Sequence, residues 1–234
     1  SIEISKNQAI GVGSTPIGGV IRINTYNPNK DKLKLSLSLG SFNHKQLNLL
    51  YNKAFQSNNL SVGGSYLKTD NDYEYPVPQS FTSSNESSIE PLGNNQFEKK
   101  NVYLNNQLSF GAHKIRITAQ YNEQEKALPN YQNNTPENAS SLSSDTWRLS
   151  YRHNIYTNLK WLNNVEFEAY QEDKAEQYLD VLADVKRLDA NYDTTKTHAD
   201  LISFFVFDNK YGDTAFSPFI ELNKQHFDSL SFDN

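Results

Sequence analysis

The sequence predicts an all-β protein, an antiparallel up-and-down sheet of about nine strands that forms part of a transmembrane β-barrel. Three observations predict it. Apolar and polar residues alternate along most of the chain, short and long linkers alternate between these segments, and no segment is apolar enough for a membrane-spanning helix. The 234 residues include 13 Phe, 14 Tyr and 2 Trp. So many aromatic residues argue against disorder, although the mean hydropathy is −0.73.

The alternation is clearest in residues 33–39, where Leu33, Leu35, Leu37 and Leu39 are separated by Lys and Ser. Successive side chains of a strand point to opposite faces, so this pattern predicts one apolar and one polar face. Similar segments follow at 47–55, 60–66, 102–110, 115–121, 147–151 and 165–169. Residues 201–207 break the alternation and predict a strand that is buried on both sides. A further strand at 216–222 is weakened by Pro218.

The linkers between the predicted strands follow a rhythm. After a first short hairpin at 40–44, short linkers at 56–59, 111–113, 156–161 and 208–213 alternate with long ones at 69–99, 122–145 and 172–197. Strands that run up and down place every second connection at the same end, so we expect all long linkers at one end. A Greek-key β-sandwich has no reason to keep this rhythm.

The third long linker, 172–197, has apolar residues at roughly helical spacing. They are Tyr178, Leu182, Val185 and Leu188. This spacing predicts a short surface helix. An extended continuation of the flanking strands is the competing interpretation.

The first 25 residues carry a family resemblance. Residues 13–25 read Gly-Ser-Thr-Pro-Ile-Gly-Gly-Val-Ile-Arg-Ile-Asn-Thr, and Ile2-Glu3-Ile4 precedes them. This stretch resembles the end of the plug domain of TonB-dependent outer-membrane receptors, although Arg22 stands where that family usually has Asn. The residues that carry the plug motif are Gly13, Gly18, Gly19 and Val20. Residues 65–73 also resemble the third barrel strand as it enters its extracellular loop.

The resemblance implies two parts: residues 1–28 as the C-terminal end of a plug domain, and 29–234 as the N-terminal part of the barrel with long extracellular loops. It implies active import of a scarce ligand, such as a ferric siderophore, a cobalamin or a glycan, across the outer membrane of a Gram-negative bacterium. The implied partners are outer-membrane lipid, a small metal chelate or vitamin, and TonB with its inner-membrane complex.

Plugged transporters have about 22 strands, so about nine strands would not close such a barrel. The chain also opens on Ser1 and contains no Met. We therefore expect a piece of a larger receptor. Two alternatives stay open, a passive porin or adhesin-type barrel and a soluble all-β ligand-binding module. The formal charge of −5 argues against a nucleic-acid partner, and the absence of Cys excludes disulfides and thiolate metal sites.

The sequence contains no catalytic motif, and its five histidines are dispersed, so we expect no enzyme. Aromatic and acidic residues of the long linkers are the candidates for ligand binding: Asp72, Tyr73, Tyr75 and Tyr131. Oxygen ligands for Ca²⁺ could come from Asp70, Asp72 and Glu74, although a solvated acidic loop is the favoured interpretation. Ca²⁺ in that loop is the one cofactor that the sequence suggests.

Other aromatic and basic residues predict how the wall of a barrel would be built. We expect Tyr121 and Tyr151 in an aromatic girdle at the level of the lipid headgroups. We expect Arg22, Arg116, Arg148 and Arg152 to face the lumen, because a charged side chain costs less free energy there than against lipid. Carboxylates such as Glu166 and Glu168 are their expected partners.

Overall fold

The computed structural model of the chain describes residues 2–5, 20–23, 30–77, 88–130, 134, 137–182, 185–209 and 212–233. All regular structure in these residues is β-strand. This part of the chain has no helix long and apolar enough to cross a membrane. The predicted all-β class is therefore confirmed.

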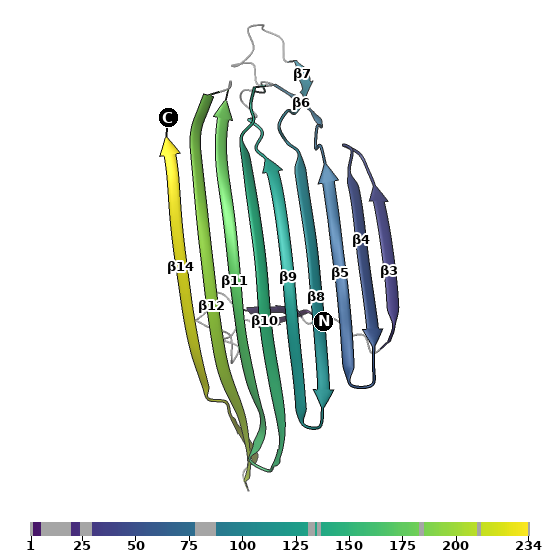
Figure 1. Cartoon of the computed structure of the whole chain (residues 1–234), viewed down its shortest axis with the longest axis vertical. Coiled ribbons are helices and arrows are strands. Elements are labelled where there is room, and N and C mark those ends of the chain that lie inside the picture. The colour runs from purple at the N-terminus through teal and green to yellow at the C-terminus, as the bar shows by residue number, and fades with distance from the viewer. Residues whose placement is uncertain are drawn as a thin grey trace.

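Ten strands form one antiparallel sheet, and neighbours in the sheet follow one another in the chain (Figure 1). The strands are β3 (Lys32–Leu39), β4 (Lys45–Ala54), β5 (Asn58–Thr69), β8 (Phe97–Phe110), β9 (His113–Ala127), β10 (Ser141–Leu159), β11 (Leu162–Leu182), β12 (Val185–Asn209), β13 (Gly212–Phe216) and β14 (Phe219–Asp233). Both β13 and β14 pair with β12, and Ser217 and Pro218 separate them. The sheet is open, with β3 at one edge and β13 and β14 at the other.

Two small two-stranded sheets complete the regular structure of the described residues. β1 (Ile2–Ser5) pairs with β2 (Val20–Ile23), and β6 (Glu74–Pro76) pairs with β7 (Ile89–Pro91). The β6–β7 hairpin lies in the connection between β5 and β8, at the upper end of the sheet in Figure 1. The turns that follow β4 and β8 lie at the opposite end (Figure 1). Long connections at one end and tight turns at the other agree with the predicted rhythm for the first two long linkers.

The helix predicted within 172–197 is wrong. β11 runs to Leu182 and β12 starts at Val185, so these residues continue two long strands. Tyr178 lies opposite Ala190 on β12 and opposite Leu142 on β10. β11 and β12 pair with each other, β11 also pairs with β10, and β12 also pairs with β14. The backbone hydrogen bonds on both sides of each strand outweigh the helical spacing of four apolar residues. The competing interpretation, extended strands, is the one that the structure shows.

The register gives the sheet two chemically different faces. Leu35, Leu49, Gly64, Val102, Tyr121 and Trp147 form one row across six strands. The neighbouring row, on the other face, contains Asn48, Ser65, Asn101, Asn122 and Thr146. We call these the apolar face and the polar face. The predicted alternation along the strands is confirmed.

The apolar face is uncovered in the described structure. Its large side chains are exposed, among them Leu35, Leu49, Leu104, Trp147 and Leu149. Buried apolar residues are few: Val77, Leu92, Ala190 and Ile202. No second sheet pairs with or extends over this face in the described ranges, so the architecture is a single layer and not a sandwich.

Residues 201–207 also differ from the prediction of a strand buried on both sides. Ile202 is buried on the polar face, whereas Leu201 and Phe207 are 42% and 46% exposed. The strand is apolar on both sides, but the apolar face has no cover there.

At the tight-turn end, Asp31 anchors the start of β3. Its carboxylate accepts hydrogen bonds from the Lys53 ammonium and from the backbone N–H of Ala54, the latter at 2.9 Å. The Lys53 ammonium is the main reason why the pKa of Asp31 lies below its ordinary value.

Candidate functional site

The polar face carries a row of charged and amide side chains across six strands. Pairing of β8 to β14 places these residues side by side: Gln107, Arg116, Arg152, Glu168, Asp200 and Glu221. The next row contains Ser150, Tyr170, His198 and Asn223. We call these two rows, together with Glu166, Arg148, Glu172 and Lys196, the charged ladder.

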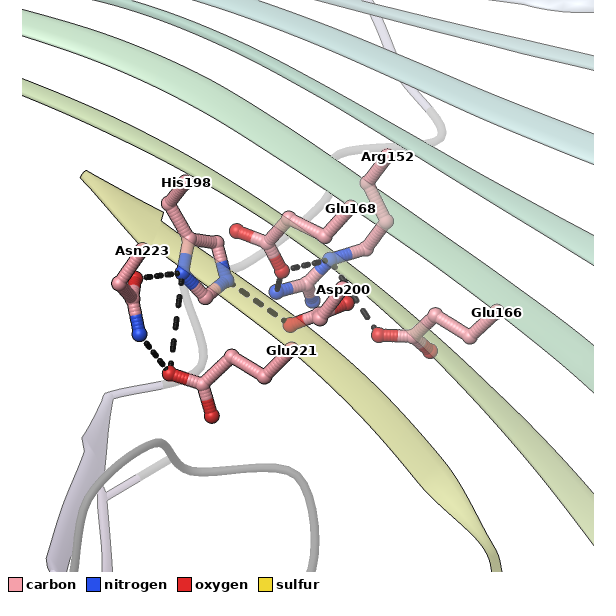
Figure 2. Close-up of polar contacts among 7 residues, drawn as sticks. All are labelled: Arg152, Glu166, Glu168, His198, Asp200, Glu221 and Asn223. Atoms are coloured by element: carbon pink, nitrogen blue, oxygen red, sulfur yellow. Dashed lines mark hydrogen bonds and ion pairs between the residues drawn. The ribbon is translucent and has the colours of Figure 1, made fainter.

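Arg152 contacts two glutamates of the ladder (Figure 2). Its Nε donates to Glu168 at 2.9 Å, its Nη2 also contacts Glu168, and its Nε lies 3.5 Å from Glu166. The guanidinium is 41% exposed, and the two glutamates are about half as exposed. The predicted pairing of an arginine with Glu166 and Glu168 is confirmed for Arg152.

His198 joins β12 to β14 (Figure 2). Its Nε2 lies 3.1 Å from Asp200 Oδ2 and its Nδ1 lies 2.6 Å from Asn223 Oδ1. The Asn223 amide nitrogen donates to Glu221, so its oxygen is the atom that faces His198. Both ring nitrogens thus face acceptors, and both contacts are hydrogen bonds only when both nitrogens carry protons. In that form a positive imidazolium lies among the carboxylates of Asp200 and Glu221.

Tyr170 lies between two basic side chains. The Arg148 guanidinium lies 3.9 Å from the centre of its ring, and the His198 ring stacks on it at 4.8 Å and 20°. Arg148 comes from β10 and His198 from β12, on opposite sides of β11. Glu172 balances the charge, 3.7 Å from Arg148 and 3.4 Å from Lys196. The ladder neutralises most of its own charge, and it offers no nucleophile beside a base.

Sequence reasoning found only part of this ladder. Arg148 and Arg152 lie on the polar face with carboxylate partners, as predicted. Arg116 instead donates to the buried Gln107 at 3.1 Å. The side chain of Arg22 lies outside the described residues. The partners Glu172 and Lys196 were missed because they fall in residues 172–197, which were expected to be a loop with a helix. His198 follows directly after that segment and was counted only among the dispersed histidines.

At the long-loop end, asparagine side chains join successive connections. Asn94 Nδ2 donates to the carbonyls of Leu128 and Ser140, at 3.0 and 2.8 Å. Asn134 accepts from the N–H of Gly93 and donates to the carbonyl of Pro91. These bonds tie the β5–β8 connection to the β9–β10 connection.

The β3–β4 turn is tied to the same end. Phe42 and Asn43 have φ angles of 59° and 54°, the conformation of a two-residue hairpin turn that glycine and asparagine adopt most easily. A bulky residue such as Phe pays on the order of 1 kcal/mol for this conformation. The Phe42 carbonyl accepts hydrogen bonds from Asp70 N and Thr69 Oγ1, and its ring packs edge-on against Tyr73 at 6.2 Å.

The predicted ligand-binding residues are in part brought together here. Tyr73 contacts Phe42, Tyr75 lies within β6, and Asp72 is exposed beside Tyr73. Tyr131 lies outside the described residues. So do Gly13, Gly18 and Gly19 of the plug motif, whereas Val20 begins β2. Phe42 was missed, since a Phe at positive φ leaves no signal in the sequence.

The structure gives no support to the Ca²⁺ candidate. Among the described residues no three His, Cys, Asp or Glu side chains are grouped as metal ligands. Asp70 instead accepts a hydrogen bond from the Asn43 amide at 2.9 Å. One pair of histidines that looked dispersed in the sequence does meet, because Nδ1 of His113 and Nε2 of His153 are 3.1 Å apart on adjacent strands.

Comparison with known proteins adds no assignment to this geometry. The chain matches no family model. No curated protein sequence matches it either. The structure by itself defines a class, an open antiparallel up-and-down β-sheet with one apolar and one ion-paired polar face.

Proposed function

We propose that the chain is the end of a plug and the first part of the barrel wall of a TonB-dependent receptor, which imports a scarce ligand across the outer membrane. One observation carries the proposal: a ten-stranded sheet leaves its apolar face uncovered while its opposite face is ion-paired. Each large apolar side chain that stays in water forgoes about 1.5–3 kcal/mol of burial. Lipid hydrocarbon is the cover that this face fits.

The apolar stripe has the height of a bilayer core. Outward residues of β8, β9 and β10 are apolar or aromatic over 102–110, 113–121 and 147–155, apart from Asn106, His113 and His153. Each stretch is about nine residues long, close to the 9–11 that a tilted strand needs to span hydrocarbon.

Aromatic side chains lie at both limits of the stripe. Tyr121 and Trp147 lie side by side toward the long-loop end. Toward the tight-turn end, Trp161 stacks on Phe205 at 5.8 Å, and Phe205 contacts Phe207 and Phe216. Aromatic belts of this kind mark the two interfaces of membrane barrels. Tyr151 does not fit the expected girdle, because it lies in the middle of the stripe, opposite Ile117.

The polar face fits the interior of a barrel. The Arg152 and Glu172 clusters would be costly against lipid and are inexpensive against a hydrated lumen. The long connections would lie outside the cell and the tight turns in the periplasm, as in bacterial outer-membrane barrels.

Cysteine labelling in intact cells tests this proposal. The chain contains no Cys, so single substitutions have no background from it. We expect a membrane-impermeant maleimide to label Gln96→Cys at the long-loop end and to leave Ala112→Cys in the β8–β9 turn unlabelled until the outer membrane is opened. Equal labelling of both positions in intact cells would contradict the proposal.

A second measurement separates active import from the passive porin and adhesin alternatives. Uptake of the ligand by the complete receptor should stop when TonB is deleted or the inner membrane is de-energised. Uptake that continues unchanged in both conditions would favour a passive barrel. A soluble all-β module would instead leave the chain soluble and monomeric without detergent.

A further inference from the structure

Two histidines interrupt the apolar face toward its tight-turn end. His113 is the first residue of β9, and it lies diagonally across from His153 on β10, because the register pairs His113 with Ile155 and Ile115 with His153. Nδ1 of His113 and Nε2 of His153 are 3.1 Å apart, and both residues are partly buried. One nitrogen of such a contact has to donate and the other has to accept, so the contact holds a single proton.

Aromatic side chains and the backbone hold the two imidazole rings in place. The Phe110 ring stacks on His113, with ring centres 5.2 Å apart and planes at 25°. The Tyr151 ring meets His153 edge-on, at 6.2 Å and 75°. β9 and β10 pair without a register shift from Ser141 to Ile155, so the strands that carry the two rings are fixed relative to each other. The two nitrogens are thus positioned before any ligand binds, which lowers the entropic cost of binding.

The neighbours of the pair on the apolar face are uncharged. From β8, β9, β10 and β11 they are Leu108, Phe110, Ile115, Tyr151, Ile155 and Phe167. Of these neighbours only the Tyr151 phenol can titrate. The charged residues Lys114, Arg116 and Glu166 belong to the same strands but to the polar face. An ion at the pair would therefore meet imidazole nitrogen, a ligand that suits Zn²⁺, Cu²⁺ and Ni²⁺, whereas Ca²⁺ and Mg²⁺ prefer oxygen.

The distance between the two nitrogens matches that of two ligands on one metal ion. Imidazole nitrogens bind Zn²⁺ at about 2.0–2.1 Å. Two such ligands at angles of about 90–109° around one ion lie about 2.8–3.4 Å apart. The observed separation of 3.1 Å falls within that range. An ion can therefore take the place of the shared proton through a rotation of the rings, without a shift of the strands.

We propose that His113 and His153 together bind a divalent transition-metal ion, of the class of Cu²⁺, Ni²⁺ and Zn²⁺, on the apolar face of the sheet. The proton between the two nitrogens leaves to water, both neutral rings coordinate the ion, and the ion fastens β9 to β10. Water fills the remaining coordination positions. The site is separate from the proposed import and does not depend on it, because the pair lies on the face opposite to the one that would line the lumen.

Titration of the untagged chain with Cu²⁺ in detergent micelles tests the site. We expect micromolar Cu²⁺ to bind and to give an electron paramagnetic resonance spectrum with hyperfine splitting from two nitrogens. Zn²⁺ should compete with Cu²⁺, and Mg²⁺ should not. His113→Ala and His153→Ala should each weaken binding by about tenfold or more, since the second imidazole binds at high effective concentration. The control His226→Ala removes an exposed histidine beside Asp228 and should change neither affinity nor spectrum.

His113→Asn separates a metal site from a purely structural hydrogen bond. The asparagine amide can still hydrogen-bond to the His153 ring, so the stability without metal should stay close to that of the unaltered chain. Copper binding should nevertheless fall as it does in His113→Ala. Saturating Zn²⁺ should raise the denaturant midpoint of the unaltered chain and not that of His113→Asn, because an ion that binds only the folded state stabilises it.

Three results would overturn the metal site. They are no binding of Cu²⁺, bound Cu²⁺ with a single nitrogen ligand, and binding that His226→Ala removes while His113→Ala leaves it unchanged. The cysteine labelling decides the receptor proposal separately. A chain with the expected sidedness that does not bind Cu²⁺ keeps the receptor proposal and loses the metal site. A chain that binds Cu²⁺ through both histidines but is soluble without detergent keeps the metal site and loses the receptor proposal.

Discussion

The ring of Tyr103 lies over Gly63 on the neighbouring strand. A Cβ atom built on Gly63 would lie 2.5 Å from two ring carbons of Tyr103, closer than real Cβ atoms approach other atoms. Both residues belong to the polar face, where Gly63 pairs directly with Tyr103. The aromatic ring thus fills the space that the glycine leaves, a known way to stabilise a glycine in a sheet.

Gly63→Ala should therefore destabilise the sheet by about 1–3 kcal/mol, because the added methyl group displaces the Tyr103 ring. Denaturant unfolding in detergent measures the change. In a Tyr103→Ala background the same substitution should cost much less, so that the double-mutant cycle shows strong coupling. An equal loss of stability from Gly63→Ala in both backgrounds would contradict the contact between Gly63 and the Tyr103 ring.

Glu168→Gln should cost more stability than Glu166→Gln. Glu168 makes the closer contacts with Arg152, whereas Glu166 lies at 3.5 Å. Because the guanidinium is partly exposed, solvent screening limits the loss to about 1 kcal/mol. Exchanging the charges in an Arg152→Glu, Glu168→Arg variant should recover part of it. A smaller loss for Glu168→Gln than for Glu166→Gln would show that the geometry of Arg152 is wrong.

His198 should carry protons on both ring nitrogens at neutral pH, since each nitrogen faces an acceptor. Nitrogen NMR shifts of the imidazole ring distinguish the doubly protonated form from the two neutral tautomers. Asn223→Ala removes one acceptor and should make deprotonation easier, whereas Tyr170→Leu removes the stacked ring and should act in the same direction. A neutral tautomer in the unaltered chain would contradict this arrangement.

Leu149→Arg and Ser150→Arg form a matched pair on opposite faces of β10. If lipid covers the apolar face, Leu149→Arg should cost about 2–4 kcal/mol, with the larger value nearer the bilayer centre. Ser150→Arg, which faces the ladder, should cost less than half as much. Both are compared by unfolding in lipid vesicles. If the apolar face is instead exposed to water, Leu149→Arg should change the free energy of unfolding very little, and that result would contradict a lipid cover.

The alternation of apolar and polar residues was sufficient to predict the strands that have one apolar and one polar face. The leucines of 33–39 and the isoleucines of 115–121 show period two without ambiguity, and both segments are strands. The pairing of Arg152 with Glu166 and Glu168 was also predictable, because adjacent strands on one face bring opposite charges together.

The features that could not be predicted from the sequence depend on contacts with residues distant in the chain or on unusual backbone conformation. Tyr178 and Leu188 have helical spacing, and only the neighbouring strands β10 and β14 decide that they are extended. The meeting of His113 with His153 depends on a register that spans 40 residues. Phe42 in a left-handed turn contradicts local preference, so only the structure reveals it.

The proposed contact between the apolar face and lipid hydrocarbon is tested most directly by Trp147 and Trp161, the only two tryptophans in the chain. Trp147 and Trp161 lie toward opposite limits of the stripe and are 52% and 47% exposed. In vesicles with lipids brominated at different depths, both should be quenched, most strongly by bromines near the headgroups. Iodide in the water should quench them weakly. Strong quenching by iodide with none by brominated lipid would contradict a lipid-facing wall.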